Sequence, residues 1–212
     1  RVLGMPLAPN QLAPTLAPHA ARLASRAQLL LDQARVFLNE GEFSLAHAHA
    51  EDAHAIDRAP SPRGDNYTDF LSSRPRGAEN LAIAEVIELS RWTGCRVHIL
   101  HLSSSDALPM IESARRDGVK LTVETCPHYL FFTEDDLARP GAIAKCAPPL
   151  RDASEQERLW AEIMKGHVDI VGSDHSPSEP GLKQGEFWSA WGGIAGVQST
   201  LAVLLDRGHH ER

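Results

Sequence analysis

The sequence has few of the features that mark nucleic-acid-binding, membrane or disulfide-rich proteins. Its 21 Lys and Arg residues are outnumbered by 28 Asp and Glu, and the net charge of −7 argues against a nucleic-acid partner or an anionic membrane surface. No apolar run reaches the roughly 18–20 residues that a membrane-spanning helix needs, and the N-terminus lacks the pattern of a signal peptide. Only three cysteines are present, widely spaced, which does not suggest a disulfide framework and favours a reducing cytoplasm.

The pattern of apolar residues predicts an α/β protein with a different N-terminal segment. Residues 1–41 form a Pro- and Leu-rich arm followed by a predicted helix over 19–40, and residues 42–212 form the main domain. Within the main domain short apolar strands alternate with amphipathic helices, which predicts a parallel sheet. The predicted strands are 43–49, 96–102, 120–124 and 168–172, and the predicted helices are 77–93, 105–117 and 154–165.

Polar residues follow the predicted strands at the points where the strands end. His49, His101, His128 and Asp174 all fall at or just beyond these C-terminal ends. An open doubly wound sheet and a (β/α)8 barrel both fit the alternation, but barrel enzymes place their catalytic groups at this face. Because a full barrel usually takes about 250 residues, the four strands amount to roughly half of one.

Three of these positions belong to short motifs that are consistent with metal binding. His47 and His49 point to one face of a strand, where two imidazoles can bind one ion, although an exposed pair at a strand end is an equally simple explanation. His101 lies at the end of the predicted strand in the segment VHILHLSSS and is a better ligand candidate than His98, which points to the opposite face. Asp174 follows a buried apolar strand in IVGSDHSP, where a carboxylate must be paired or metal-bound, unless it caps a turn.

The segment VETCPHYL places a histidine beside a cysteine at the end of another strand. Pro127 stops the strand, so His128 is predicted in the loop, where it could hold a substrate carbonyl or carboxylate or bind a nearby backbone carbonyl. Cys126 and Cys146 could be thiolate ligands, but each neighbours prolines and lacks a CxxC partner. Buried structural thiols are the simpler interpretation.

As an ordered set, the motifs HAED, HLSSSDA, ETCPHYL, AKCAPPLRD, SDHSP and AWGGIAGVQS resemble the allantoinase branch of the cyclic amidohydrolases over roughly residues 45–204. The resemblance implies strands 5–8 of a metal-dependent (β/α)8 barrel, and opening of the hydantoin ring of allantoin to allantoate by metal-activated water. It implies that His49, His101 and Asp174 bind metal, with Asp174 also the catalytic base and then acid. By the same resemblance, His128, Cys126 and Ala147 line the substrate.

The resemblance also implies groups that the sequence does not contain. The family holds two divalent metals, often zinc, through an HxH on the first strand and a bridging carbamylated lysine, whereas the first lysine of this chain is Lys120. We therefore expect a partial barrel with little or no activity alone. The alternatives are another cyclic amidohydrolase, such as a dihydropyrimidinase (hydantoinase) or a dihydroorotase, or a non-catalytic relative. A homo-oligomer is also expected, since the family forms tetramers.

Overall fold

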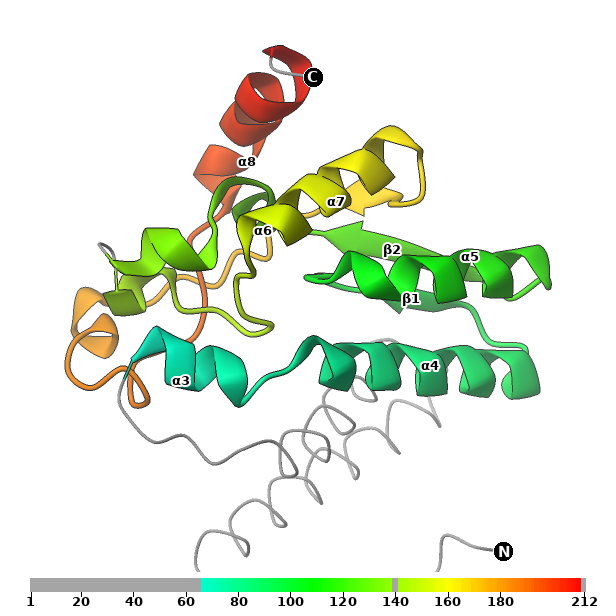
Figure 1. Cartoon of the computed structure of the whole chain (residues 1–212), viewed down its shortest axis with the longest axis horizontal. Coiled ribbons are helices and arrows are strands. Elements are labelled where there is room, and N and C mark those ends of the chain that lie inside the picture. Colours follow the sequence, from blue (N-terminus) through cyan, green and yellow to red (C-terminus); the bar gives the residue numbers. More distant parts are fainter. Residues whose placement is uncertain (1–65, 139–140, 211–212) are drawn as a thin grey trace, which may run out of the picture.

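The computed structural model describes residues 66–138 and 141–210, which fold into a small parallel sheet with helices packed along it (Figure 1). The strands are β1 (Val97–Ile99), β2 (Leu121–Thr125) and β3 (Ile170–Val171). The α-helices are α3 (Tyr67–Ser72), α4 (Arg76–Thr93), α5 (Leu108–Arg116), α6 (Pro127–Phe131), α7 (Ala153–Met164) and α8 (Val197–Val203). The single-turn and irregular helices are η2 (Ser105–Ala107), η3 (Glu134–Ala138), η4 (Gly141–Ala144), η5 (Pro180–Lys183) and the π-helical η6 (Leu204–His210).

The three strands are parallel and lie in sequence order, β1-β2-β3. Val97 pairs with Leu121 and Ile99 with Val123, while Glu124 at the end of β2 pairs with Ile170. Helices α4 and α5 precede β1 and β2, and α7 precedes β3, so each strand enters the sheet from the same end. The predicted α/β alternation and parallel pairing are therefore confirmed for the described part of the chain.

Side chains alternate between two unlike faces of the sheet. Residues 97, 99, 121, 123 and 125 are buried, and the four apolar ones among them, 97, 99, 121 and 123, belong to one apolar core with Ile111 and Leu130. The opposite face is polar: the Nδ1 atom of His98 lies 2.7 Å from the hydroxyl of Thr122, and its Nε2 atom lies 3.5 Å from a carboxylate oxygen of Glu124. No helix among the described residues covers β3 fully, and Ile170 is 46% exposed.

Most predicted elements are found, with changed ends. The predicted helices 77–93 and 154–165 correspond to α4 and α7, and the predicted helix 105–117 begins as the turn η2 before α5. Gly94 caps the C-terminal end of α4, as predicted. It has a left-handed φ of 75°, and its N–H donates to the carbonyl of Ser90 at 2.8 Å. β1 and β3 are shorter than the predicted strands 96–102 and 168–172, whereas β2 keeps the predicted length and is shifted by one residue. The predicted helix 19–40, the strand 43–49 and the domain boundary after residue 41 lie outside the described residues.

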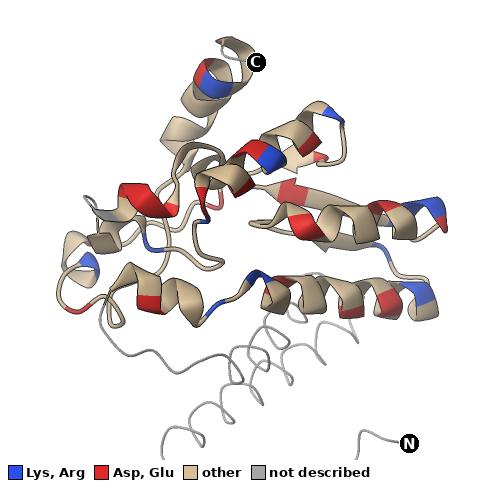
Figure 2. Ribbon diagram, viewed as in Figure 1, with Lys and Arg blue, Asp and Glu red and all other residues tan. Residues whose placement is uncertain are grey.

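Charged residues are spread over the helices with both signs interspersed (Figure 2). Some form ion pairs on one helix, such as Lys165 with Glu162 at 2.7 Å, and others join helices, such as Arg91 of α4 with Asp117 after α5 at 3.2 Å. Exposed pairs of this kind contribute little stability, roughly 0–1 kcal/mol each. In the part of the chain that the structure describes, no helix has both the length and the apolar character required to cross a bilayer.

Candidate active site at the strand ends

His101 and Asp174 follow β1 and β3, which flank β2. Because the strands are parallel, both residues lie at the same edge of the sheet. Both have positive φ angles, 42° for His101 and 41° for Asp174, in a region that residues with a Cβ atom rarely adopt. Such strain costs about 1–3 kcal/mol and is concentrated at functional sites. The backbone thus holds the two predicted metal ligands in conformations that few residues with a Cβ atom adopt.

Asp174 meets two residues from the neighbouring strand end. The Sγ atom of Cys126, a ring nitrogen of His128 and a carboxylate oxygen of Asp174 all lie within 4.8 Å of one another. Cys126 is the residue that precedes α6, and His128 is the second residue of that helix, so β2 and α6 place both side chains. Cys126 is fully buried and His128 is 4% exposed, whereas Asp174 is exposed. These three residues are called the strand-end cluster below.

Two expectations about this cluster were wrong. His128 was predicted in a loop, but Pro127 starts the short helix α6 because its fixed φ suits the first turn, and the histidine is buried there. Asp174 was expected to follow a buried strand. β3 is only partly buried in the described structure, so solvent reaches the carboxylate and burial alone does not force it to be paired.

The imidazole of His128 is held in its neutral form. Burial lowers its pKa to about 4, the nearby Asp174 opposes that shift, and His101 adds to it. Neither ring nitrogen has a hydrogen-bond partner among the described residues. A buried imidazole without partners is uncommon in native structures, and it marks His128 as a group that is ready to receive a ligand.

The thiols of Cys126, in the cluster, and of Cys146 are not nucleophiles. Burial raises the pKa of Cys126 well above its usual range, and the negative charge of Asp174 raises it further. Burial likewise raises the pKa of Cys146 to about 12, again with a contribution from Asp174. Both thiols are therefore protonated near neutral pH, which fits the interpretation of buried structural cysteines better than thiolate catalysis.

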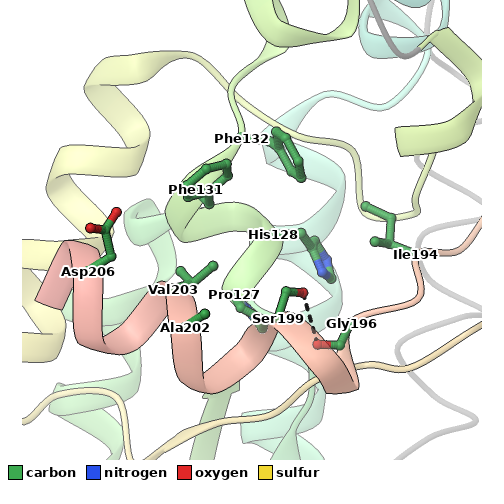
Figure 3. Close-up of a pocket in the computed structure, with 10 residues that line it drawn as sticks. All are labelled: Pro127, His128, Phe131, Phe132, Ile194, Gly196, Ser199, Ala202, Val203 and Asp206. Carbon is green, nitrogen blue, oxygen red and sulfur yellow. Dashed lines mark hydrogen bonds between the residues drawn. The ribbon is translucent and has the colours of Figure 1, made fainter.

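A pocket of about 360 Å³ opens beside His128, between α6 and α8 (Figure 3). Apart from His128, Ser199 and Asp206, its lining is apolar or glycine; the remaining lining residues are Pro127, Phe131, Phe132, Ile194, Gly196, Ala202 and Val203. Gly196 brings the start of α8 against the Asp174 loop, because a Cβ atom there would lie 2.3 Å from the carbonyl oxygen of Ser173. His128 thus lines the pocket and also belongs to the strand-end cluster.

Two carboxylates fix the segment that follows His101. Glu79 of α4 accepts hydrogen bonds from the backbone N–H and the hydroxyl of Ser103, at 2.7 and 2.6 Å. Glu155 of α7 is fully buried and accepts from the backbone N–H of Ser105. Bonds from N–H groups to charged acceptors are among the stronger ones in proteins. The helices therefore hold the strand end beside His101 in one position.

Two lysines that sequence reasoning missed join the loops around the site. Lys145 is 7% exposed, and its ammonium donates to the carbonyl oxygens of Phe187, Trp188 and Ala190 at 2.8, 3.0 and 2.8 Å. Lys183 donates to the carbonyl of Gly193 at 2.6 Å and to carbonyls of the 142–145 segment. For Lys145 the sequence did carry a signal of burial, because this lysine stands in the run AKCAPP, between an alanine and a buried cysteine.

The structure brings together part of the predicted site. Cys126, His128 and Asp174 meet, and His101 is close enough to act on the charge of His128. Ala147 directly follows the buried Cys146 and is exposed. His49 lies outside the described residues.

Comparisons with known proteins place this arrangement in a family. The chain is 52% identical over 169 residues to an allantoinase of Solibacter usitatus, and 46% identical over 187 residues to an allantoinase of Streptomyces avermitilis. These matches cover 78% and 84% of this chain but 37% and 42% of the relatives, so the chain spans about two fifths of their length. No protein-family model matches the chain.

The fold is similar to that of solved hydantoinases. The L-hydantoinase (dihydropyrimidinase) of Arthrobacter aurescens superposes with a TM-score of 0.67 at 30% sequence identity, over 78% of this chain and 36% of that one. The parallel sheet, the cluster at its strand ends and these relatives together identify the chain as a member of the cyclic amidohydrolases. Within that family, the chain belongs to the allantoinase branch.

Proposed function

We propose that this chain is the part of an allantoinase-type cyclic amide hydrolase that corresponds to strands 5–8 of a (β/α)8 barrel. The reaction is the opening of the hydantoin ring of allantoin to allantoate. The observation that carries the proposal is the meeting of Asp174, His128 and Cys126 at the strand ends, in a chain 46–52% identical to allantoinases. Barrel enzymes place their catalytic groups at this end of the sheet.

The residues present fit a divalent metal. His101 and Asp174 offer nitrogen and oxygen donors at one sheet edge, and we propose that they hold the ion together with His49, with zinc as the usual metal of this donor set. A bound divalent ion would lower the pKa of a water so that hydroxide is available near neutral pH to attack an amide carbon. The exposed carboxylate of Asp174 can take a proton from that water and return it to the leaving nitrogen, since its side chain is open to the solvent side of the site.

The other residues of the site would bind and orient the ring. His128 is neutral at physiological pH, so it can donate or accept a hydrogen bond without adding charge. We propose that it contacts the substrate together with Cys126 and the backbone near Ala147. Lys145 and Lys183 act indirectly, because their hydrogen bonds hold the 187–193 loop against the 142–145 segment. We further propose a reducing cytoplasm, given that Cys95, Cys126 and Cys146 are all free, and a homo-oligomer.

A chimera tests the proposed function, because the matched segment can be placed in a complete relative. The 169 matched residues of this chain replace their counterpart in the Solibacter usitatus allantoinase, and hydrolysis of allantoin is measured beside the 212-residue chain alone. We expect the chimera to hydrolyse allantoin, its Asp174→Asn variant to lose about 10³-fold or more in turnover, and the chain alone to show little activity. A folded chimera that opens dihydrouracil or hydantoin but not allantoin would instead favour the dihydropyrimidinase function, to which the A. aurescens structure points.

A folded chimera that opens none of these rings would support a non-catalytic relative instead. The metal content of the purified chimera separates two causes of that result. A chimera with about two ions per chain, the family's number, and no turnover would place the fault in substrate contacts. A chimera with no metal would place it in the ligands His49, His101 and Asp174.

A further inference from the structure

We infer that Cys126, His128 and Asp174 form a second, soft-metal site that takes Zn²⁺ or Cd²⁺ and shares one residue, Asp174, with the ligand set proposed for hydrolysis. The three residues come from the end of β2, the first turn of α6 and the loop after β3. Their sulfur, nitrogen and oxygen donors lie within 4.8 Å of one another. Of the residues proposed to hold the catalytic metal, only Asp174 belongs to this cluster.

The state of His128 points to a ligand at this place. His128 is only 4% exposed, and both of its ring nitrogens lack a hydrogen-bond partner in the described structure. A buried polar atom without a partner costs stability, so native proteins keep few of them. A metal ion bound between His128 and its two neighbours would satisfy one of the two nitrogens directly.

The donor set selects the class of metal. Thiolate and imidazole ligands favour Zn²⁺, Cu⁺ or Cd²⁺ over Mg²⁺ and Ca²⁺, which prefer oxygen. In a tetrahedral zinc site the ligand atoms are roughly 3–4 Å apart, so the cluster has to contract by about 1 Å. The exposed Asp174 side chain can turn to close that gap. Three protein ligands leave a fourth position for water.

Binding exchanges one bond for another. The sulfur–hydrogen bond of Cys126 breaks, its proton passes to the buffer, and a sulfur–metal bond forms while the metal loses bound water. The nitrogen of His128 and the carboxylate of Asp174 bind as they stand. One consequence rests on the proposed function: an ion held here occupies the Asp174 carboxylate, so an excess of Zn²⁺ or Cd²⁺ would inhibit hydrolysis.

Cadmium binding to the 212-residue chain tests the site, since a thiolate–cadmium bond gives an ultraviolet charge-transfer band. We expect a band that saturates at one ion per chain for the cluster. It is lost in Cys126→Ser but retained in Cys146→Ser, which removes another buried thiol as a matched control. His128→Gln and Asp174→Asn keep the band and weaken the affinity by about tenfold or more. Circular dichroism establishes that each variant is folded.

The site does not exist if the chain gives no band, if the band survives in Cys126→Ser, or if Cys146→Ser abolishes it equally. If Cys126→Ser does not fold, the other two variants decide: unchanged cadmium affinity in both overturns the site, and weakened affinity in both supports it. These outcomes are independent of catalysis. A chimera that binds cadmium in this way but opens no ring would leave the soft-metal site standing and refute only the hydrolase function.

Discussion

The ammonium of Lys145 donates a 2.8 Å hydrogen bond to the backbone carbonyl of Ala190, across 45 residues of sequence. Two further carbonyls, of Phe187 and Trp188, accept from the same nitrogen, and the ring of Phe187 lies 5.1 Å from it. A buried lysine is tolerated only with such partners. The Lys145 side chain therefore stabilises the loop of residues 187–190, which contains no strand in the described structure.

Replacing Lys145 by methionine should remove these bonds and leave buried carbonyls without a donor. We expect a loss of about 2–4 kcal/mol in the free energy of unfolding, measured by urea denaturation. Lys165→Met is the matched control, because Lys165 is exposed and forms an ion pair with Glu162 in the last turn of α7. Its loss should stay within about 0.5 kcal/mol. Equal losses in the two variants would contradict the role of Lys145.

Glu155 should carry a large share of the attachment of α7 to α4. Its buried carboxylate accepts bonds from Arg76 of α4, from Arg158 and from the N–H of Ser105. Burial opposes ionisation, but the bonds from Ser105 and Arg158 outweigh it and hold the pKa of Glu155 below its usual 4.5. The Glu155→Gln variant should lose about 2–4 kcal/mol at neutral pH, measured by urea denaturation.

The same carboxylate gives a pH test. The folded pKa is below the unfolded one, so its contribution is fully present above about pH 4.5 and is lost as the pH falls through the folded pKa. The difference in unfolding free energy between the parent and Glu155→Gln should therefore shrink in acid. A difference that stays constant down to about pH 3 would contradict this ionic role.

His128 should produce a separate acid destabilisation at higher pH. Its pKa is about 4 in the folded chain and 6.5 when unfolded, so below pH 6.5 the unfolded state binds a proton that the folded state does not. Stability should fall as the pH drops from about 6.5 to about 4, by at most roughly 3 kcal/mol, and no further below that. Urea denaturation at several pH values measures this slope.

The His128→Gln variant is the control for that slope, since glutamine does not titrate. We expect the variant to lose the part of the pH dependence between about pH 6.5 and pH 4 while keeping the part below it that Glu155 causes. If the parent and the variant show the same slope in this window, the imidazole is not held neutral by burial.

How far the sequence predicts this structure differs between the elements and the site. The helix ending at Gly94 and the position of Asp174 after a strand follow from local rules, because a glycine stop and an apolar run act over a few residues. The position of His128 in a buried turn depends on how α6 packs against α7 and α8, which no local pattern records. The role of Lys145 depends on a loop more than 40 residues away.

The charge network around Glu155 shows the same limit. Its three donors come from positions 3, 50 and 79 residues away along the sequence. In α7, Asp152 caps the helix by accepting from the N–H of Glu155, a signal that sequence can supply. That Glu155 then turns inward and is fully buried follows only from the packing of η2 against α4 and α7.

Two glycines beside the site give the last test, because they differ in what a methyl group would meet. At Gly196 a Cβ atom would lie 2.3 Å from the carbonyl oxygen of Ser173, one residue before Asp174, and backbone cannot easily move aside. At Gly192 nothing lies within 4 Å. We expect Gly196→Ala to cost about 1–3 kcal/mol in unfolding free energy, and Gly192→Ala to stay within about 0.5 kcal/mol.

The same pair separates an effect on the site from one on stability alone. The clash at Gly196 pushes on the backbone that carries Asp174, so Gly196→Ala should also weaken cadmium binding at the strand-end cluster, by about tenfold. Gly192→Ala should bind cadmium as the parent does. If Gly196→Ala is as stable as Gly192→Ala and binds cadmium equally well, the loop before α8 does not position Asp174, and the contact with Ser173 has no functional consequence.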